Sequence, residues 1–197
     1  MRIWVVGTTG SGKTTFARKV ETRLGIPRVE MDAITWGPGW QGLDKADRPE
    51  FERRVLAATS GDSWVCDGNY TMHDLMLPRA THVVWLDYSR ARIMYRVIKR
   101  SIIHALNGRE LWSGNREDWR RWLNADHPIR WAWSTHARRR KRYDERLSGG
   151  AVAHATVWRL RKPSEAHACL DALAAEWATR GRPLGAASPI ETLTLPR

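Results

Sequence analysis

The sequence predicts an α/β fold: a three-layer sandwich in which a parallel β-sheet lies between helices on both of its faces. Short apolar runs alternate with longer amphipathic segments along most of the chain, which is the pattern of parallel strands joined by helices. Four of the apolar runs end directly in glycine or aspartate. The 197 residues are enough for one domain with its own core. We expect a domain over residues 1–180 and a Gly- and Pro-punctuated tail over residues 181–197.

Apolar and amphipathic periodicity predicts the position of each element. Strands are expected at residues 2–6, 28–31, 63–66, 81–86 and 155–160. Helices are expected at residues 14–24, 49–59, 72–77, 89–106, 128–147 and 164–179. Asp47, Ser89 and Ser164 stand where N-cap residues are favoured. Residues 35–42 are predicted to form a loop, and residues 107–127 a polar, irregular insertion.

Acidic residues and a glycine loop follow four of the predicted strands. Gly7, Asp32, Asp67 and Asp87 each come directly after an apolar run. Because ligands bind at the carboxyl ends of parallel strands, these residues are expected to converge on one edge of the sheet. For Asp32 and Asp67 the alternative is a carboxylate that caps a turn or helix. Asp87 is expected to cap or support a basic helix.

The segment after the first strand, GTTGSGKT, fits the phosphate-binding pattern G-x-x-x-x-G-K-[ST] in full. Its glycines let successive N–H groups surround a phosphate, and the following helix adds its positive end. Lys13 is expected to reach the β- and γ-phosphates of ATP, and the Thr14 hydroxyl to bind Mg²⁺. The residues predicted to bind the nucleotide are Gly7, Thr8, Thr9, Gly10, Ser11, Gly12, Lys13, Thr14 and Thr15.

The rest of the chain favours a kinase among the proteins that use this loop. The sequence has no Asn/Thr-Lys-x-Asp motif, which a GTPase needs to bind guanine. No predicted strand ends in the Asp-Glu pair that is usual in motor ATPases. A small chain with a basic insertion fits a kinase better.

Positive charge is concentrated in one part of the chain. The net charge is +12, and residues 90–146 hold 16 Lys and Arg against 6 Asp and Glu. Such a field attracts anions, either a triphosphate or nucleic acid.

No apolar stretch reaches the ~18 residues that a membrane span needs, and no signal peptide is recognisable at the start. The two cysteines, Cys66 and Cys169, are expected to be buried free thiols. Together these features predict a cytoplasmic protein.

At DGNY, residues 67–70, the chain begins to resemble a known group. It is similar to the adenylate-kinase-like branch of the P-loop nucleoside and nucleotide kinases whose members are labelled DNA topology modulation proteins. The resemblance covers about residues 1–173 and rests on five stretches. They are the phosphate loop, LGIPRVEMDAITWGPGW, SWVCDGNY, RVIKR and RWAW. It implies a five-stranded parallel sheet in the order 2-3-1-4-5, a lid over about residues 107–127, and transfer of the ATP γ-phosphoryl group to a small acceptor.

The resemblance also implies roles for acidic and aromatic residues. Asp67 resembles the residue that assists Mg²⁺ or the acceptor, and Asp32 the aspartate that contacts the acceptor. Tyr70 is expected to belong to the same acceptor site. Adenylate kinases carry Asp-Gly-Phe-Pro-Arg at the third strand, where this chain has Asp-Gly-Asn-Tyr-Thr. The arginine that clamps an acceptor phosphate is therefore missing there, which argues against AMP as the acceptor.

Arginines before and after the insertion are candidates for catalysis. Arg96 and Arg100 resemble the Arg-x-x-x-Arg pair that precedes the lid in kinases. They share a helix face with Arg92, so a solvated basic face is the alternative. Arg138, together with Arg140, is expected to clamp the phosphates from the far side. Within the lid, Arg109 and Arg116 are further candidates.

These features leave more than one hypothesis for the function. The leading one is an ATP-dependent phosphotransferase with a nucleotide, nucleoside, sugar or small acid as acceptor. The alternative is an ATP-binding protein that uses its basic half to bind DNA or RNA. A third is a regulatory protein that binds ATP without turnover. The loop at residues 37–40 either shapes the acceptor pocket or forms a rigid turn.

Overall fold

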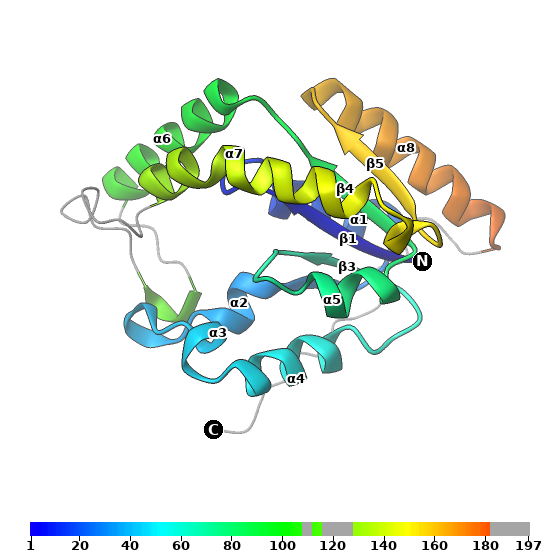
Figure 1. The fold of residues 1–197 in the computed structure, drawn as a ribbon, viewed down its shortest axis with the longest axis horizontal. Coiled ribbons are helices and arrows are strands. Elements are labelled where there is room, and N and C mark those ends of the chain that lie inside the picture. Colours follow the sequence, from blue (N-terminus) through cyan, green and yellow to red (C-terminus); the bar gives the residue numbers. More distant parts are fainter. Residues whose placement is uncertain (108–111, 116–127, 182–197) are drawn as a thin grey trace.

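The computed structural model describes residues 1–107, 112–115 and 128–181. Most of the predicted lid, including Arg109 and Arg116, and nearly all of the predicted tail lie outside the described residues. Figure 1 shows a central sheet with helices on both of its faces, so the predicted three-layer α/β architecture is confirmed.

The sheet contains five parallel strands in the order β2-β3-β1-β4-β5, as the resemblance implied. The strands are β1 (Arg2–Gly7), β2 (Arg28–Glu30), β3 (Trp64–Asp67), β4 (His82–Leu86) and β5 (Thr156–Leu160). In the register of the central strand, Val5 pairs with Asp67 of β3 and with Val84 of β4. The ends of β1 and β3 therefore lie side by side, which places the phosphate loop next to Asp67.

The helices are α1 (Lys13–Leu24), α2 (Met31–Thr35), α3 (Leu43–Ala46), α4 (Arg48–Ala58), α5 (His73–Met76), α6 (Arg90–Asn107), α7 (Pro128–Leu147) and α8 (Pro163–Thr179). Short 3-10 turns include η1 (Pro38–Trp40) and η3 (Trp112–Gly114). Within the part of the chain that is described, none of the helices has the length and apolar character needed to cross a membrane.

Alternation along the strands divides the core between the two faces of the sheet. On β1, Ile3 and Val5 join a cluster with α1, α6 and α8. Trp4 and Val6 join the opposite cluster, which includes residues of α4, α5 and α7. All four side chains are fully buried. Helix α7 contributes to both clusters, with Ala132 in the cluster that contains α6 and Tyr143 and Leu147 in the opposite one.

The N-cap predictions have different outcomes. Asp47 caps α4, because its Oδ1 accepts a hydrogen bond from the backbone N–H of Glu50 at 3.0 Å. The Ser89 hydroxyl accepts from the N–H of Arg92 at 3.5 Å, directly before α6. The prediction that Ser164 caps the last helix is wrong. Helix α8 begins at Pro163, and the Glu165 carboxylate accepts from the N–H of Lys162. Proline has no N–H and fits the first turn, so the helix starts one residue earlier than predicted.

The predicted second strand also ends earlier. β2 stops at Glu30, and Met31 starts the short helix α2, which carries Asp32. The Thr35 hydroxyl donates to the Met31 carbonyl and stabilises that single turn. Asp32 therefore lies on a helix at the carboxyl edge of the sheet.

Candidate phosphoryl-transfer site

The loop between β1 and α1 has the backbone shape of a phosphate cradle. Gly10 and Gly12 adopt φ values of +78° and +94°, in the left-handed region that favours glycine. Gly12 is the N-cap of α1 and has no side chain to occupy the N–H groups of the first turn. These N–H groups and the positive end of α1 form an anion-binding site. The geometry suits the β- and γ-phosphates of a nucleotide.

Lys13 lies inside this loop, and its Nζ donates to the Thr8 carbonyl at 3.3 Å. Burial lowers the pKa of Lys13 below its ordinary value, and Arg139 and Arg100 lower it further. Asp32 and Asp67 act in the opposite direction. The charges of two carboxylates and two guanidinium groups therefore act on the Lys13 ammonium group.

Thr14 and Asp67 form the candidate metal site. The Thr14 hydroxyl donates to Oδ1 of Asp67 at 3.4 Å, and the Asp67 side chain is 1% exposed. Burial raises the pKa of Asp67 to about 7, while Lys13 opposes the shift. Among the described residues, Asp67 Oδ2 has no hydrogen-bond partner. A buried carboxylate oxygen beside a hydroxyl fits Mg²⁺, which takes one or two protein ligands and substrate phosphates for the rest.

Asp32 and Tyr70 are brought together from two separate turns. The Tyr70 hydroxyl donates a hydrogen bond to Oδ1 of Asp32. Burial, and next the charge of Asp32, raises the pKa of Tyr70 above its ordinary value, so the hydroxyl keeps its proton. The Asp32 carboxylate is thus oriented by Tyr70, and its charge acts on Lys13. This arrangement suits a group that accepts a proton from a hydroxyl.

The two arginines of α6 face the phosphate loop. Arg96 Nη1 donates to the Ser11 carbonyl at 3.1 Å, and its guanidinium lies 5.2 Å from the centre of the Tyr88 ring. Arg100 is near enough to Lys13 to affect the pKa of that residue. Arg92, four residues before Arg96, is exposed. The structure therefore places Arg96 and Arg100 at the site but leaves Arg92 in solvent.

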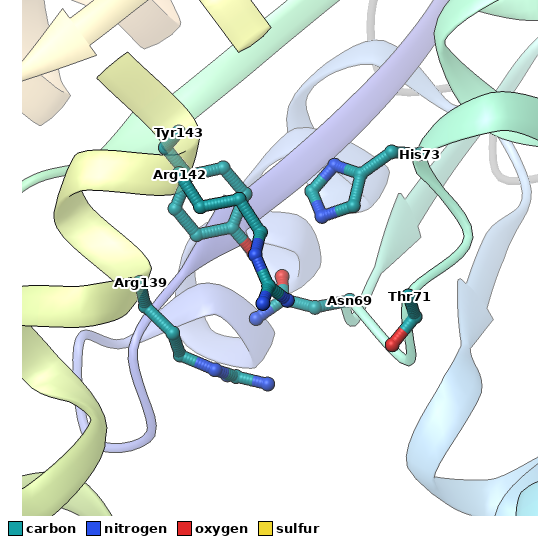
Figure 2. A pocket seen from close by; sticks show the side chains of 6 residues that line it. All are labelled: Asn69, Thr71, His73, Arg139, Arg142 and Tyr143. Atoms are coloured by element: carbon teal, nitrogen blue, oxygen red, sulfur yellow. The ribbon is translucent and has the colours of Figure 1, made fainter. Parts of the chain in front are cut away.

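On α7 the arginine beside the site is Arg139, which sequence reasoning missed. Arg138 is exposed, and Arg140 forms an ion pair with Asp87 at 3.0 Å. Arg139 is half-buried and affects the pKa of Lys13. The available signal was helical periodicity: the buried residues Ala132, His136 and Tyr143 put residue 139 on the inner face. Figure 2 shows the Arg139 side chain extending from α7 toward the segment after β3.

Asp87 supports the basic helix α7, which is one of the two roles predicted for it, capping or supporting a basic helix. Its carboxylate accepts from Nε of Arg140 at 3.2 Å and from Nε of Arg159 at 2.9 Å. The Arg159 guanidinium also lies 4.1 Å from the Trp85 ring centre. Asp87 thus ties α7 to β4 and β5.

The comparisons with known proteins concern the fold. No family model matches the chain, and no curated protein sequence matches it significantly. One similar solved structure is a shikimate kinase from Bacteroides thetaiotaomicron, with a TM-score of 0.50, 14% identity, and coverage of 90% of this chain and 98% of that one. Another is the deoxyadenosine kinase from M. mycoides with the products dCMP and a flexible dCDP bound. It has a TM-score of 0.52, 11% identity, and coverage of 91% and 100%. The chain has the P-loop kinase fold.

In this P-loop kinase fold, the described part of the predicted lid lies against the loop that follows Asp32. The Ser113 hydroxyl donates to the Trp36 carbonyl at 2.7 Å. Asn115 forms hydrogen bonds with the backbone of Gly37 and Trp40. Residues of the insertion therefore reach the side of the site where Asp32 lies.

Proposed function

We propose that this protein is an ATP-dependent phosphotransferase that moves the γ-phosphoryl group of Mg-ATP to a small acceptor. The observation that carries the proposal is the position of Lys13. It lies in a phosphate-binding loop, where the charges of two carboxylates and of guanidinium groups from α6 and α7 act on it. Phosphoryl transfer depends mainly on positioning and on cations that neutralise charge on the oxygens. The P-loop kinase fold agrees with this function.

Each group has a defined task in the proposed reaction. The loop N–H groups and Lys13 hold the β- and γ-phosphates, while Arg96, Arg100 and Arg139 neutralise the charge that spreads over the transferred group. Thr14 and Asp67 would hold Mg²⁺, which would supply positive charge that stabilises the transferred group.

Asp32 completes the transfer on the acceptor side. An acceptor hydroxyl gives its proton to the Asp32 carboxylate as its oxygen attacks the γ-phosphorus atom. A new P–O bond forms, the bond to the β-phosphate oxygen breaks, and ADP leaves with that electron pair. Tyr70 holds Asp32 in place through its hydrogen bond.

Membership of the branch labelled DNA topology modulation proteins is part of this proposal and rests on the sequence resemblance. The label itself does not imply DNA binding. The alternative function, an ATP-binding protein that associates with DNA or RNA, predicts submicromolar duplex binding near physiological salt. That binding should be steeply salt-dependent and unaffected by Lys13→Ala.

The test is ADP formation from Mg-ATP across nucleotides, nucleosides, sugars and small acids, with wild type, Lys13→Ala and Lys19→Ala. Lys19 is exposed on the same helix, so its loss controls for removal of one charge. We expect a strong acceptor-dependent rate that is lost in Lys13→Ala and kept in Lys19→Ala. ATP binding with no acceptor-dependent rate would contradict the proposal and favour the nucleic-acid or regulatory hypothesis.

A further inference from the structure

A polar pocket lies beside the phosphate loop, between α7 and the turn after β3. Its lining residues are Asn69, Thr71, His73, Arg139, Arg142 and Tyr143. Figure 2 shows the guanidinium groups of Arg139 and Arg142 entering the space between the two segments. The lining thus contains two permanent positive charges and no carboxylate.

The charges of this pocket are unmatched, unlike those of Arg140 and Arg146 on the same helix. Arg140 pairs with Asp87, and Arg146 pairs with Asp74 at 2.9 Å. Within the described ranges, neither Arg139 nor Arg142 forms an ion pair with a carboxylate. Arg139 packs on the ring of Trp131 instead, 5.5 Å from its centre. Two arginines are therefore directed into a polar pocket without a protein anion between them.

Buried polar atoms that lack partners also line the pocket. Asn69 is 5% exposed and His73 is 3% exposed. Asn69 Oδ1 and His73 Nδ1 have no hydrogen-bond partner among the described residues. Burial, together with the charges of Arg146 and Arg142, lowers the pKa of His73 to about 4. His73 is thus neutral near pH 7, and the positive charge of the pocket comes from the arginines.

The turn that lines the pocket is held in an unusual conformation. Tyr70 and Thr71 have φ values of 33° and 58°, in the left-handed region that non-glycine residues rarely adopt. Arg48 holds both of them, donating to the Tyr70 carbonyl at 2.7 Å and to the Thr71 carbonyl at 3.3 Å. Strained residues of this kind persist where the surrounding structure constrains them, and they are concentrated at functional sites.

The pocket lies next to the phosphate loop but is lined by different residues. Asn69 Nδ2 donates to the Gly7 carbonyl at 2.8 Å and joins the two sites. Tyr70, the next residue, orients Asp32. The turn that lines the pocket therefore also contacts the phosphate loop and the proposed proton acceptor.

We propose that this pocket binds an oxyanion, a phosphate or a carboxylate, carried by the phosphoryl acceptor. The inference rests on the proposed function and narrows its acceptor to anionic molecules that also carry a hydroxyl group. Arg142 and Arg139 form charge-assisted hydrogen bonds with the oxyanion, and the Thr71 hydroxyl and a His73 ring N–H donate to it. Arg142 then serves acceptor binding, whereas Arg139 also stands beside the transferred group.

A binding experiment tests the pocket without depending on catalysis. Inorganic phosphate is titrated calorimetrically into protein saturated with a Mg-bound, non-hydrolysable ATP analogue. The proteins are wild type, Arg142→Gln and Lys141→Gln, since Lys141 is exposed on the same helix. We expect Arg142→Gln to weaken phosphate binding at least tenfold and Lys141→Gln to change it less than twofold. Equal affinity in Arg142→Gln, no phosphate binding to the loaded wild type, or weaker binding of the analogue itself would overturn the proposal.

A kinetic comparison then identifies the source of the anion. Acceptors are tested in pairs, a nucleoside monophosphate against its nucleoside and a hydroxy acid against its amide. We expect the anionic member of one pair to have the higher kcat/KM, and Arg142→Gln to raise its KM. Equal kcat/KM within every active pair would overturn the inference. If no acceptor is phosphorylated, the proposed function fails, and the calorimetric result still decides whether the pocket binds oxyanions.

Discussion

Asn115 accepts a hydrogen bond from the backbone N–H of Trp40 at 3.0 Å, although 75 residues separate them in the sequence. The Asn115 amide also donates to the Gly37 carbonyl at 2.9 Å, and its side chain is buried. One side chain thus joins both ends of the loop after Asp32 to the insertion between α6 and α7. Trp40 adopts a φ of 62° in this loop, so the contact helps to hold an unfavourable backbone conformation.

The first prediction follows from this contact. Asn115→Ala removes both hydrogen bonds, each worth about 1 kcal/mol, and leaves the loop near Asp32 less ordered. We expect the KM of the acceptor to rise roughly tenfold while the KM of ATP changes much less. Asn115→Asp keeps the acceptor for the Trp40 N–H and should be intermediate. Steady-state kinetics of the three proteins would contradict this account if both KM values rose equally.

A second prediction concerns the pH dependence that Asp67 introduces. Its pKa is about 7 in the folded protein, against an ordinary value of 3.8, because the carboxyl is buried. The folded state therefore holds a proton that the unfolded state releases between about pH 4 and pH 7. The contribution of Asp67 to stability should fall as pH rises through that window, by up to about 4 kcal/mol.

Urea unfolding at several pH values measures this effect. Wild type should lose stability relative to Asp67→Asn as pH rises from about 4 to about 7, whereas the exposed change Asp171→Asn should leave the profile of wild type unchanged. Mg²⁺ favours the ionised carboxylate, so Mg-ATP should bind more tightly as pH passes 7 in wild type, and this added dependence should vanish in Asp67→Asn. Parallel profiles for wild type and Asp67→Asn would contradict the assignment.

The third prediction concerns the attachment of α7. Asp87→Ala leaves Arg140 and Arg159 without their buried carboxylate, and breaking such a cluster costs about 3 kcal/mol. Asp144 also pairs with Arg159, but its side chain is 54% exposed, so Asp144→Ala should cost less than about 1 kcal/mol. Urea denaturation compares the two. Arg139 stands next to Arg140 on this helix, so loosening α7 should displace Arg139 from the site. The kcat of Asp87→Ala should therefore also fall. Equal stability of the two variants would argue against Asp87 as the anchor of α7.

The fourth prediction concerns Gly10, which packs against α6. A Cβ at this position would overlap the Val97 side chain, and the φ of +78° strains any other residue. Gly10→Ala should therefore lower the free energy of unfolding by about 2 kcal/mol and weaken ATP binding. Adding Val97→Ala should remove the overlap and restore part of the ATP affinity. Gly150→Ala, at an open position, is the control. No recovery of ATP affinity in the double variant would contradict the predicted overlap with Val97.

The phosphate loop and the strands were predictable because their signals are local. The spacing of Gly7, Gly12, Lys13 and Thr14 is enough to indicate the cradle, and apolar runs mark the strands. The strand order came from the resemblance to a family, since periodicity does not determine which strands are neighbours. Asp32 and Asp67 were predicted at the carboxyl edge of the sheet, where the structure places both.

Other parts of the site depend on contacts between distant segments. Arg138 was chosen as a clamp, but the inner face of α7 is set by packing against the sheet, and Arg139 occupies that face. The pairing of Tyr70 with Asp32 spans 38 residues, and that of Asn115 with Gly37 spans 78. No local pattern indicates such pairs. The pocket of Asn69, His73 and Arg142 likewise forms only when α7 lies over the turn after β3.

The most direct test of the central claim follows the terminal phosphate of ATP. Wild type and Lys13→Ala are incubated with Mg-ATP labelled in its γ-phosphate and with anionic hydroxylated acceptors, and the products are separated. We expect the label to appear covalently on an acceptor in wild type, at a rate that exceeds release of inorganic phosphate, and Lys13→Ala to abolish this transfer. Label that appears only as inorganic phosphate with every acceptor, or that transfers equally in Lys13→Ala, would contradict it.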